Sequence, residues 1–555
     1  MGLLSHPKHG GMTWARANCS GCFGMADGLD SIGGDPFHRT ESAIIVDGNV
    51  AVFALSSVSS ASACDVSRMF PAGIAPVLPV AAAARAVPLS DVTRVAERLA
   101  AQIRSYASRA VVVTICFDEP DHIPDTKEAE QQRRDALLLV LDSGHDERRS
   151  GKKARNARTV FDDIRDRRTR YLTIDRVVHA CIRMLGAADR SEVRARCGTG
   201  SPNDCLLIID GAAPVAEDAL PNRGGTPVRR VYSFQLPSID RFGRATNDQA
   251  LAPDASRALE RYADAMIEQP TRPVAVGEAD LKLLVVDDEL RGIASAPPTT
   301  TDPDPEPWLK RIVWISTDTD QVPLSIARYA RTDRAQASEI PERRVQTLLL
   351  SRRPSSSHRF EVVDLTALAI LVSEPALQPI VGTGGGTGGG TGGGAGLGLA
   401  MDVLAKRVEL SSPLFRGRNL VMLLALALGG CDFVPPPRSQ PWRRTGCILD
   451  ALHRTVTLDG RTHPLLQGTP LCVPAAVAGS DGVVKEALDF MCRVAKLMLV
   501  LSRMTYPSTV RTRGRRIDGG VDVQTESLDQ IARAAAWTVG YWTWGQRWTT
   551  GRVGG

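Results

Sequence analysis

The sequence predicts an α/β fold built around a mostly parallel central sheet with helices on its faces. Short apolar runs of strand length alternate along the chain with longer segments of helical periodicity, which is the pattern of β-α-β units. Several of these apolar runs end in an aspartate, and ligands of such sheets bind beyond the carboxyl ends of the strands. The 555 residues, 43% of them hydrophobic, are enough for a sizeable core and for two or more structural units.

The first expected strand covers residues 43–46 in AIIVD, after residues 1–40, which show no clear period. A helix is expected over 90–108, because Ser90 is a suitable N-cap and the following apolar residues share one face. The further elements expected, in chain order, are strand 111–117, strand 205–209 ending at Asp210, a helix near 254–268, a helix opened by GEAD at 277–280, strand 312–316 and an apolar helix 420–428.

Composition changes along the chain divide it into segments. Residues 382–398, GTGGGTGGGTGGGAGLG, form a low-complexity stretch typical of a flexible linker, and residues 291–307 and 331–358 are predicted to be loops or insertions. We expect an irregular N-terminal segment 1–40, the N-terminal part of the core 41–330 with a basic insertion 131–170, an insertion with the Gly-rich linker 331–400, and the C-terminal part of the core with a helical extension 401–555.

Charge and cysteine content exclude several classes of protein. The net charge of +5 suits a polyanionic partner, whereas an aromatic content of 5% argues against extended base stacking. The eleven cysteines are scattered, and several lie in apolar strands, so we expect an intracellular protein of the nucleus or cytoplasm that is not secreted. No signal peptide opens the sequence and the run 420–428 is too short for a bilayer, so no membrane association is expected.

Seven carboxylates occur in settings that suggest a shared cation site. Three follow apolar runs, and four form two pairs spaced two residues apart in VGEADLK and STDTDQ. Buried like charges about 4 Å apart repel by roughly 4 kcal/mol at an effective dielectric constant of 20, so their convergence requires cations. Mg²⁺ and Mn²⁺ prefer oxygen ligands, and two such ions can act together on a phosphodiester. The seven are Asp47, Asp118, Glu278, Asp280, Asp318, Asp320 and Asp432.

Five blocks in this order resemble the flap endonuclease and XPG-type 5′ nucleases and their relatives, the 5′→3′ exoribonucleases and the herpesvirus host-shutoff nucleases. The blocks are IIVDGN, CFDEPDHIPDTKEAEQQRRD, VGEADLK, STDTDQ and LALGGCDFVP. The resemblance implies a PIN-like core and two-metal hydrolysis of DNA or RNA with the seven carboxylates as catalytic ligands of two Mg²⁺ or Mn²⁺ ions. Long insertions between the blocks are common in viral members, and the Ala/Arg-rich composition and glycine repeat fit an enzyme of a large DNA virus. It also implies that Lys127, Arg133 and Arg134 contact the substrate phosphate.

The chain departs from flap endonucleases after Asp432, where FVPPPRSQPWRR has no helix-hairpin-helix turn. The FVP sequence is more similar to the exoribonuclease and host-shutoff relatives, and thus favours RNA. The alternative function is a catalytically inert member of the fold that binds nucleic acid or a protein partner. GEAD and STDTD taken singly are more often a capped helix start and a polar loop.

Three local patterns leave alternatives open. Asp210 in LLIIDGAAP also resembles the second block, although Asp118 is favoured because Lys and Arg residues follow it. The basic stretch 148–170 is either a clamp that contacts phosphates or a solvated loop. The pairs His6 and His9, and Cys19 and Cys22, could bind Zn²⁺, but their spacing matches no strong zinc signature.

Overall fold

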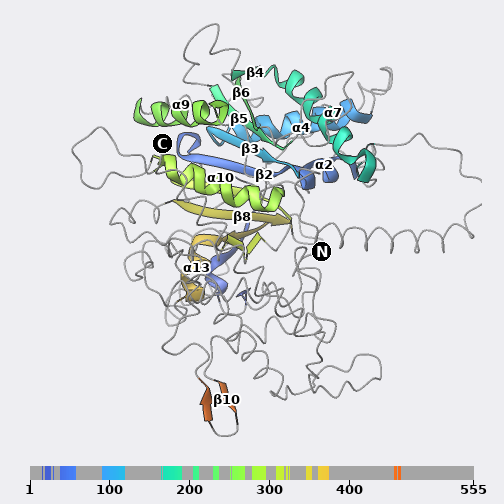
Figure 1. Ribbon diagram of the computed structural model, residues 1–555. Coiled ribbons are helices and arrows are strands. Elements are labelled where there is room, and N and C mark those ends of the chain that lie inside the picture. Colours follow the sequence, from blue (N-terminus) through green and yellow to red (C-terminus); the bar gives the residue numbers. More distant parts are fainter. Residues whose placement is uncertain are drawn as a thin grey trace, which may run out of the picture.

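The computed structural model has one nine-stranded sheet flanked by helices and a separate two-stranded hairpin, so the predicted α/β class is confirmed. Figure 1 shows the sheet elements and their helices with the N-terminal half of the chain contributing most of them. The structure describes residues 15–16, 19–26, 29, 38–57, 91–118, 160, 164, 167–190, 204–211, 229–236, 251, 253–268, 278–294, 308–317, 321–322, 324–325, 345–352, 360–373, 456–458 and 461–463.

The large sheet has the strand order β1-β9-β8-β7-β2-β3-β5-β6-β4. The hairpin pairs β10 with β11 in antiparallel fashion. The bounds are β1 Phe23–Ala26, β2 Ser42–Asp47, β3 Val112–Cys116, β4 Ala188–Asp189, β5 Asp204–Asp210, β6 Arg229–Gln235, β7 Arg311–Ile315, β8 Gln346–Arg352, β9 Phe360–Asp364, β10 Val456–Leu458 and β11 Arg461–His463.

The sheet is mixed rather than mostly parallel. Its five central strands, β8-β7-β2-β3-β5, are joined by parallel pairings. Antiparallel pairings add β6 and β4 at one side and β9 and β1 at the other. The prediction of a parallel sheet therefore holds for the centre and is wrong for the flanks, where the added strands lack the helical crossovers that reveal parallel pairing in a sequence.

Helices cover both faces of the central strands. On one face, α4 contacts α2, α7 and β3. On the other face, α10 contacts α9, β2 and β3. Helix α13 packs on the strands β8 and β9. The helices are η1 Ser20–Cys22, η3 Arg39–Glu41, α2 Gly48–Ser57, α4 Asp91–Ala107, α7 Arg167–Leu185, α9 Pro253–Glu268, α10 Ala279–Ala294 and α13 Leu365–Ser373.

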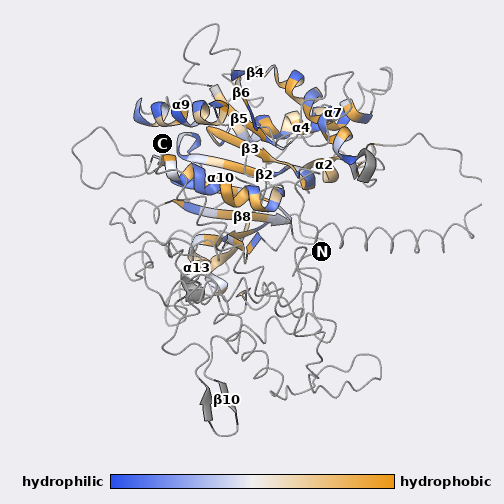
Figure 2. Cartoon of the chain, in the orientation of Figure 1, coloured by the Kyte–Doolittle hydropathy of each residue, from blue (hydrophilic) through white to orange (hydrophobic). Residues whose placement is uncertain are grey.

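The two faces follow from alternation along the strands. Ile44 and Val46 of β2 belong to the hydrophobic core with Leu99 of α4, so Ile45 and Asp47 point to the α10 face. Figure 2 shows the central strands as mostly hydrophobic and α9 as hydrophilic along much of its length. Helix α10 differs from α9 in what it buries. Lys282, Asp287 and other charged residues of α10 are buried together with its apolar residues.

Most of the elements expected from sequence periodicity are present with shifted ends. The strands predicted at 43–46, 111–117, 205–209 and 312–316 are β2, β3, β5 and β7, and the three helices predicted before residue 300 are α4, α9 and α10. Two predictions are wrong: β8 lies in the expected loop 331–358, and β1 lies in the expected irregular segment 1–40. Ser90, the linker 382–398, the helix 420–428 and most of the basic insertion 131–170 lie outside the described residues.

Candidate functional site

The carboxyl ends of the central parallel strands meet at one edge of the sheet. Asp47 is the last residue of β2 and lies opposite Cys116 in β3, which in turn lies opposite Asp210, the last residue of β5. On its other side, Val46 pairs with Ile315 at the end of β7. The chain runs from β2 outward to β3 and β5 and returns to β7 and β8 on the opposite side. The edge between β2 and β7 is thus a topological switch point, where such sheets bind ligands.

Asp47 lies at this switch point and is held by two donors. Its Oδ1 accepts a hydrogen bond from the backbone amide of Val50 at 3.1 Å, which makes it the N-cap of α2. Its Oδ2 accepts a hydrogen bond from Ser316 Oγ at 3.4 Å. Ser316 directly follows β7 and is two residues before the predicted ligand Asp318.

The turn after Asp47 packs closely on the next strand end. A Cβ added at Gly48 would lie 2.5 Å from the ring of Phe117, the residue that precedes Asp118. Only glycine permits this approach of the α2 start to the end of β3. The sequence IIVDGN therefore places Asp47 next to the chain segment that carries Asp118.

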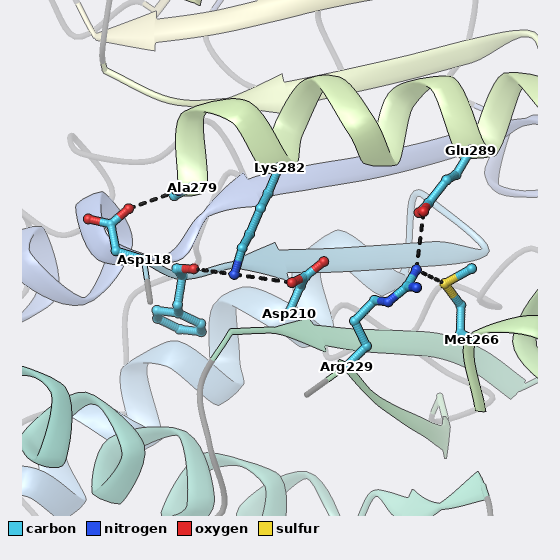
Figure 3. Close-up of polar contacts among 8 residues, drawn as sticks. Asp118, Asp210, Arg229, Met266, Ala279, Lys282 and Glu289 are labelled. Atoms are coloured by element: carbon cyan, nitrogen blue, oxygen red, sulfur yellow. Dashed lines mark hydrogen bonds and ion pairs between the residues drawn. The ribbon is translucent and has the colours of Figure 1, made fainter. Parts of the chain in front are cut away.

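Asp118 ties the end of β3 to the beginning of α10. Its Oδ1 accepts a hydrogen bond from the backbone amide of Ala279 at 2.8 Å (Figure 3). This amide is one of the donors that the first turn of a helix leaves without an intrahelical acceptor, and the positive end of the helix dipole favours a carboxylate there. Asp118 is half-buried, so its side chain remains in contact with solvent.

The same first turn carries the two acidic residues of GEAD. Glu278 is fully buried and directly precedes the amide that Asp118 binds. Asp280 is 7% exposed, and its Oδ1 accepts a hydrogen bond from Gln321 Nε2. Gln321 directly follows the segment 318–320, so residues on both sides of that segment contact predicted ligands, Ser316 reaching Asp47 and Gln321 reaching Asp280.

The structure therefore brings four of the predicted carboxylates to one edge of the sheet, from three different elements. These four are Asp47, Asp118, Glu278 and Asp280. Among the residues described, no three His, Cys, Asp or Glu side chains are arranged to hold one metal ion. The remaining predicted residues, Asp318, Asp320, Asp432, Lys127, Arg133 and Arg134, lie outside the described part of the chain.

Asp210, the competitor of Asp118, is engaged differently. Its Oδ1 lies 3.2 Å from Lys282 Nζ, and both side chains are completely buried (Figure 3). A carboxylate that already neutralises a buried ammonium is a weaker candidate for a cation ligand than a half-exposed one. This contact favours Asp118 as the second-block residue.

Sequence reasoning missed the residues that support these carboxylates. Ser316, Gln321 and Lys282 all contact predicted ligands or their neighbours, yet each belongs to a segment far from its partner in sequence. Lys282 alone carried a signal, because a lysine within the apolar run LKLLVV is seldom buried unless it is paired.

The cysteine pair near the N-terminus lies apart from this edge, beside α13. Cys19 and Cys22 are buried free thiols, and burial raises the pKa of Cys19 to about 12. Burial, followed by the nearby Asp364 carboxylate, raises the pKa of Cys22 well above its ordinary value. His6 and His9 lie outside the described residues.

Comparison of the chain with protein-family models and with curated protein sequences finds no match. Within the described ranges, no helix is both long enough and apolar enough to cross a bilayer. The acidic side chains at the sheet edge offer carboxylate oxygens, the ligands that hard divalent cations such as Mg²⁺ or Mn²⁺ prefer.

Proposed function

We propose that this protein is a divalent-metal-dependent nuclease with a PIN-like core that hydrolyses phosphodiester bonds of DNA or RNA. The observation that carries the proposal is the placement of Asp47, Asp118, Glu278 and Asp280 at the edge of the sheet that holds the switch point. Ser316 and Gln321, which flank residues 318–320, each contact one of these four carboxylates. That pair of contacts supports adding Asp318 and Asp320 to the same site.

The residues of the proposed site have two kinds of role. Asp47, Asp118, Glu278, Asp280, Asp318, Asp320 and Asp432 would hold two Mg²⁺ or Mn²⁺ ions, directly or through water. Such ions supply charge neutralisation at the scissile phosphate and activation of the attacking water. Lys127, Arg133 and Arg134 would bind and orient the phosphate backbone without reading its sequence.

The described residues already orient the acidic groups. Ser316 and the amide of Val50 fix both oxygens of Asp47, and Gln321 fixes one oxygen of Asp280. The dipole at the start of α10 lowers the cost of gathering negative charge around Glu278 and Asp118. The half-exposed side chain of Asp118 gives this edge access to solvent, and thus to a charged substrate.

A catalytically inert binding protein is the second candidate, and one observation favours it. Asp47 caps α2, Asp118 caps α10 and Asp280 binds Gln321, so each of these acidic residues has a structural role that needs no metal. In that case the edge would serve only to bind nucleic acid or a protein partner.

Cleavage assays on single-stranded RNA, single-stranded DNA and a 5′ flap, each with Mg²⁺, Mn²⁺ or a chelator, distinguish the two candidates. A nuclease cleaves at least one substrate only with the divalent ion, and the Asp318→Ala/Asp320→Ala variant loses cleavage while retaining its unfolding transition. Glu97→Ala, which removes an exposed carboxylate of α4, is the control and should cleave like the wild type. Cleavage that persists in the double variant would reject the assignment.

Metal binding can be followed separately from cleavage. A ligand that binds only the folded protein stabilises it by about 2.7 kcal/mol at a hundredfold excess over its Kd. Mn²⁺ should therefore raise the melting temperature of the wild type and of Glu97→Ala, and should raise that of the double variant less. An inert protein would show no such shift in any of the three.

A further inference from the structure

The start of α10 is joined to the sheet by a buried lysine. Lys282 Nζ lies 3.2 Å from Asp210 Oδ1, and both side chains are 0% exposed. The same ammonium donates a hydrogen bond to the backbone carbonyl oxygen of Phe117 at 2.8 Å. Lys282 thus links α10 to the ends of β3 and β5 at once, as Figure 3 shows for the labelled side chains.

Two contacts join the same pair of short segments. Phe117 accepts from the Lys282 side chain, and its neighbour Asp118 accepts from the Ala279 amide at 2.8 Å. Within the helix, the Lys282 amide donates to the Glu278 carbonyl at 2.9 Å, which closes the first turn. The position of Glu278 and Asp280 relative to Asp118 is therefore set by a turn that Lys282 anchors from one side and Asp118 from the other.

The backbone next to Asp210 is built to admit this ammonium. Gly211 has a φ of +106°, outside the range that L side chains adopt readily. A Cβ there would overlap both the Phe117 carbonyl oxygen and Lys282 Nζ, the latter at 2.5 Å. Glycine at this position leaves the space into which the lysine extends.

Stability alone does not account for such a pair. Replacing a buried ion pair with neutral residues of similar size is often harmless to stability, and in some proteins such a pair is retained because it fixes one geometry. From these contacts we infer that Lys282 is a positioning residue. Its ammonium, held by Asp210 and Phe117, fixes the first turn of α10. That turn places Glu278 and Asp280 toward the proposed cation site beside Asp118, so the inference rests on the proposed function.

A comparison of three variants of the full-length protein tests this role. Lys282→Met leaves Asp210 as a lone buried charge, and Lys282→Met/Asp210→Asn removes both charges. The matched control is a second buried ion pair between α10 and the sheet, Arg229 Nη1 to Glu289 Oε1 at 3.1 Å, which is also drawn in Figure 3. Glu289 lies seven residues after Lys282 in α10, and the control variant is Arg229→Met/Glu289→Gln.

Two measurements apply to every variant. Hydrogen exchange of a peptide spanning the Ala279 amide, measured without metal, reports how firmly the first turn is held. Calorimetric titration with Mn²⁺ reports the Kd. The single variant should lose thermal stability and the Lys282/Asp210 double variant should regain most of it, since no lone buried charge remains. The double variant should nevertheless exchange faster around Ala279 and bind Mn²⁺ about 10- to 100-fold more weakly, as expected when a group that orients metal ligands is lost.

The control should keep wild-type exchange at Ala279 and the wild-type Mn²⁺ Kd. A Lys282/Asp210 double variant with wild-type values of both, or a control with the same losses, would overturn the positioning role. A wild-type protein that neither binds Mn²⁺ nor cleaves nucleic acid would instead contradict the proposed function. Metal-free exchange at Ala279 would still decide whether Lys282 fixes the turn.

Discussion

Asp118 Oδ1 accepts a hydrogen bond at 2.8 Å from the amide of Ala279, a residue 161 positions further along the chain. In this contact the carboxylate is a hydrogen-bond acceptor for the first turn of α10, which requires only an oxygen atom. In the proposed site it would also be a cation ligand, which requires its charge. Substitutions at this one position can therefore separate folding from metal binding.

Asp118→Asn keeps the acceptor and removes the charge. We expect its free energy of unfolding to fall by about 1 kcal/mol, because the amide oxygen of Asn still accepts from the Ala279 amide but a neutral acceptor contributes less than a charged one. Its Mn²⁺ affinity and its cleavage rate should fall by about 100-fold or more. Loss of a group that merely orients a metal ligand lowers affinity by about 10- to 100-fold, and loss of the ligand itself should lower it at least as much. Asp118→Ala removes the acceptor altogether and should lose about 1 kcal/mol more. Wild-type cleavage by Asp118→Asn would remove this residue from the site.

Stability should depend on pH through Asp364. Burial, only partly offset by hydrogen bonds from Ala367 and Gln346, raises the pKa of this carboxyl from 3.8 to about 6. The folded state thus holds the proton more tightly, so its contribution is complete below pH 4 and is lost as the pH rises through 6. The loss amounts to roughly 3 kcal/mol.

Asp364→Asn isolates that contribution. Between pH 4 and pH 7, the wild type should lose stability relative to Asp364→Asn. The measurement is the free energy of unfolding of both proteins, from urea denaturation in a series of buffers. Other carboxylates titrate equally in both proteins and cancel in the difference. A difference that stays constant with pH would show that Asp364 ionises normally.

The two glycines with positive φ should respond differently to alanine. Gly186 has a φ of +64° and open space around its Cβ position, so Gly186→Ala should cost about 1–2 kcal/mol from backbone strain alone. Gly211→Ala meets Phe117 and Lys282 in addition to its strain, and should cost more. Chemical denaturation of the two variants side by side measures this. Equal losses would mean that the space beside Gly211 is not needed by Lys282.

Trp314 should contribute to stability through its indole N–H. Its Nε1 donates at 2.8 Å to Asp287 Oδ2, a fully buried carboxylate that also pairs with Arg291. Trp314→Phe should lower the free energy of unfolding by about 1.5–3 kcal/mol, the range for a hydrogen bond to a charged group.

Trp308 provides the matched control for this prediction. Its Nε1 donates at 3.2 Å to the neutral carbonyl of Ile293, and Trp308→Phe should cost only about 0.5–1.5 kcal/mol. The two free energies of unfolding can be compared from denaturation followed by circular dichroism. A larger loss at Trp308 would contradict the importance assigned to the buried Asp287 carboxylate.

The elements that the sequence predicts are those with a local cause. The apolar run 43–46 and the amphipathic pattern of α4 specify their own state, because burial of one run or one face decides it. Strand β8 was missed because polar residues precede it in PERR, and β1 because FGMA has little strand propensity of its own. Pairing with β9 makes both of them strands, and pairing between distant segments leaves no periodic trace.

In the candidate site too, the residues with a local sequence signal could be predicted and the long-range contacts could not. Asp47 and Asp118 were predictable because a carboxylate after a buried strand stands out, and GEAD because a helix follows it. The contacts of Ser316 with Asp47 and of Gln321 with Asp280 depend on how segments fold onto one another, so residue type and spacing did not reveal them. Lys282 was visible as an anomaly in an apolar run, but its partner Asp210 was not.

The pairing of Phe23 in β1 with Val363 in β9 has a consequence for biosynthesis. A nascent chain emerging from the ribosome exposes β1 long before its neighbour exists, and β2 likewise waits for β7. Such late partners slow folding and leave unpaired strands open to other chains in the meantime. Among the described strands, β1 therefore waits longest during synthesis for its hydrogen-bonding partner.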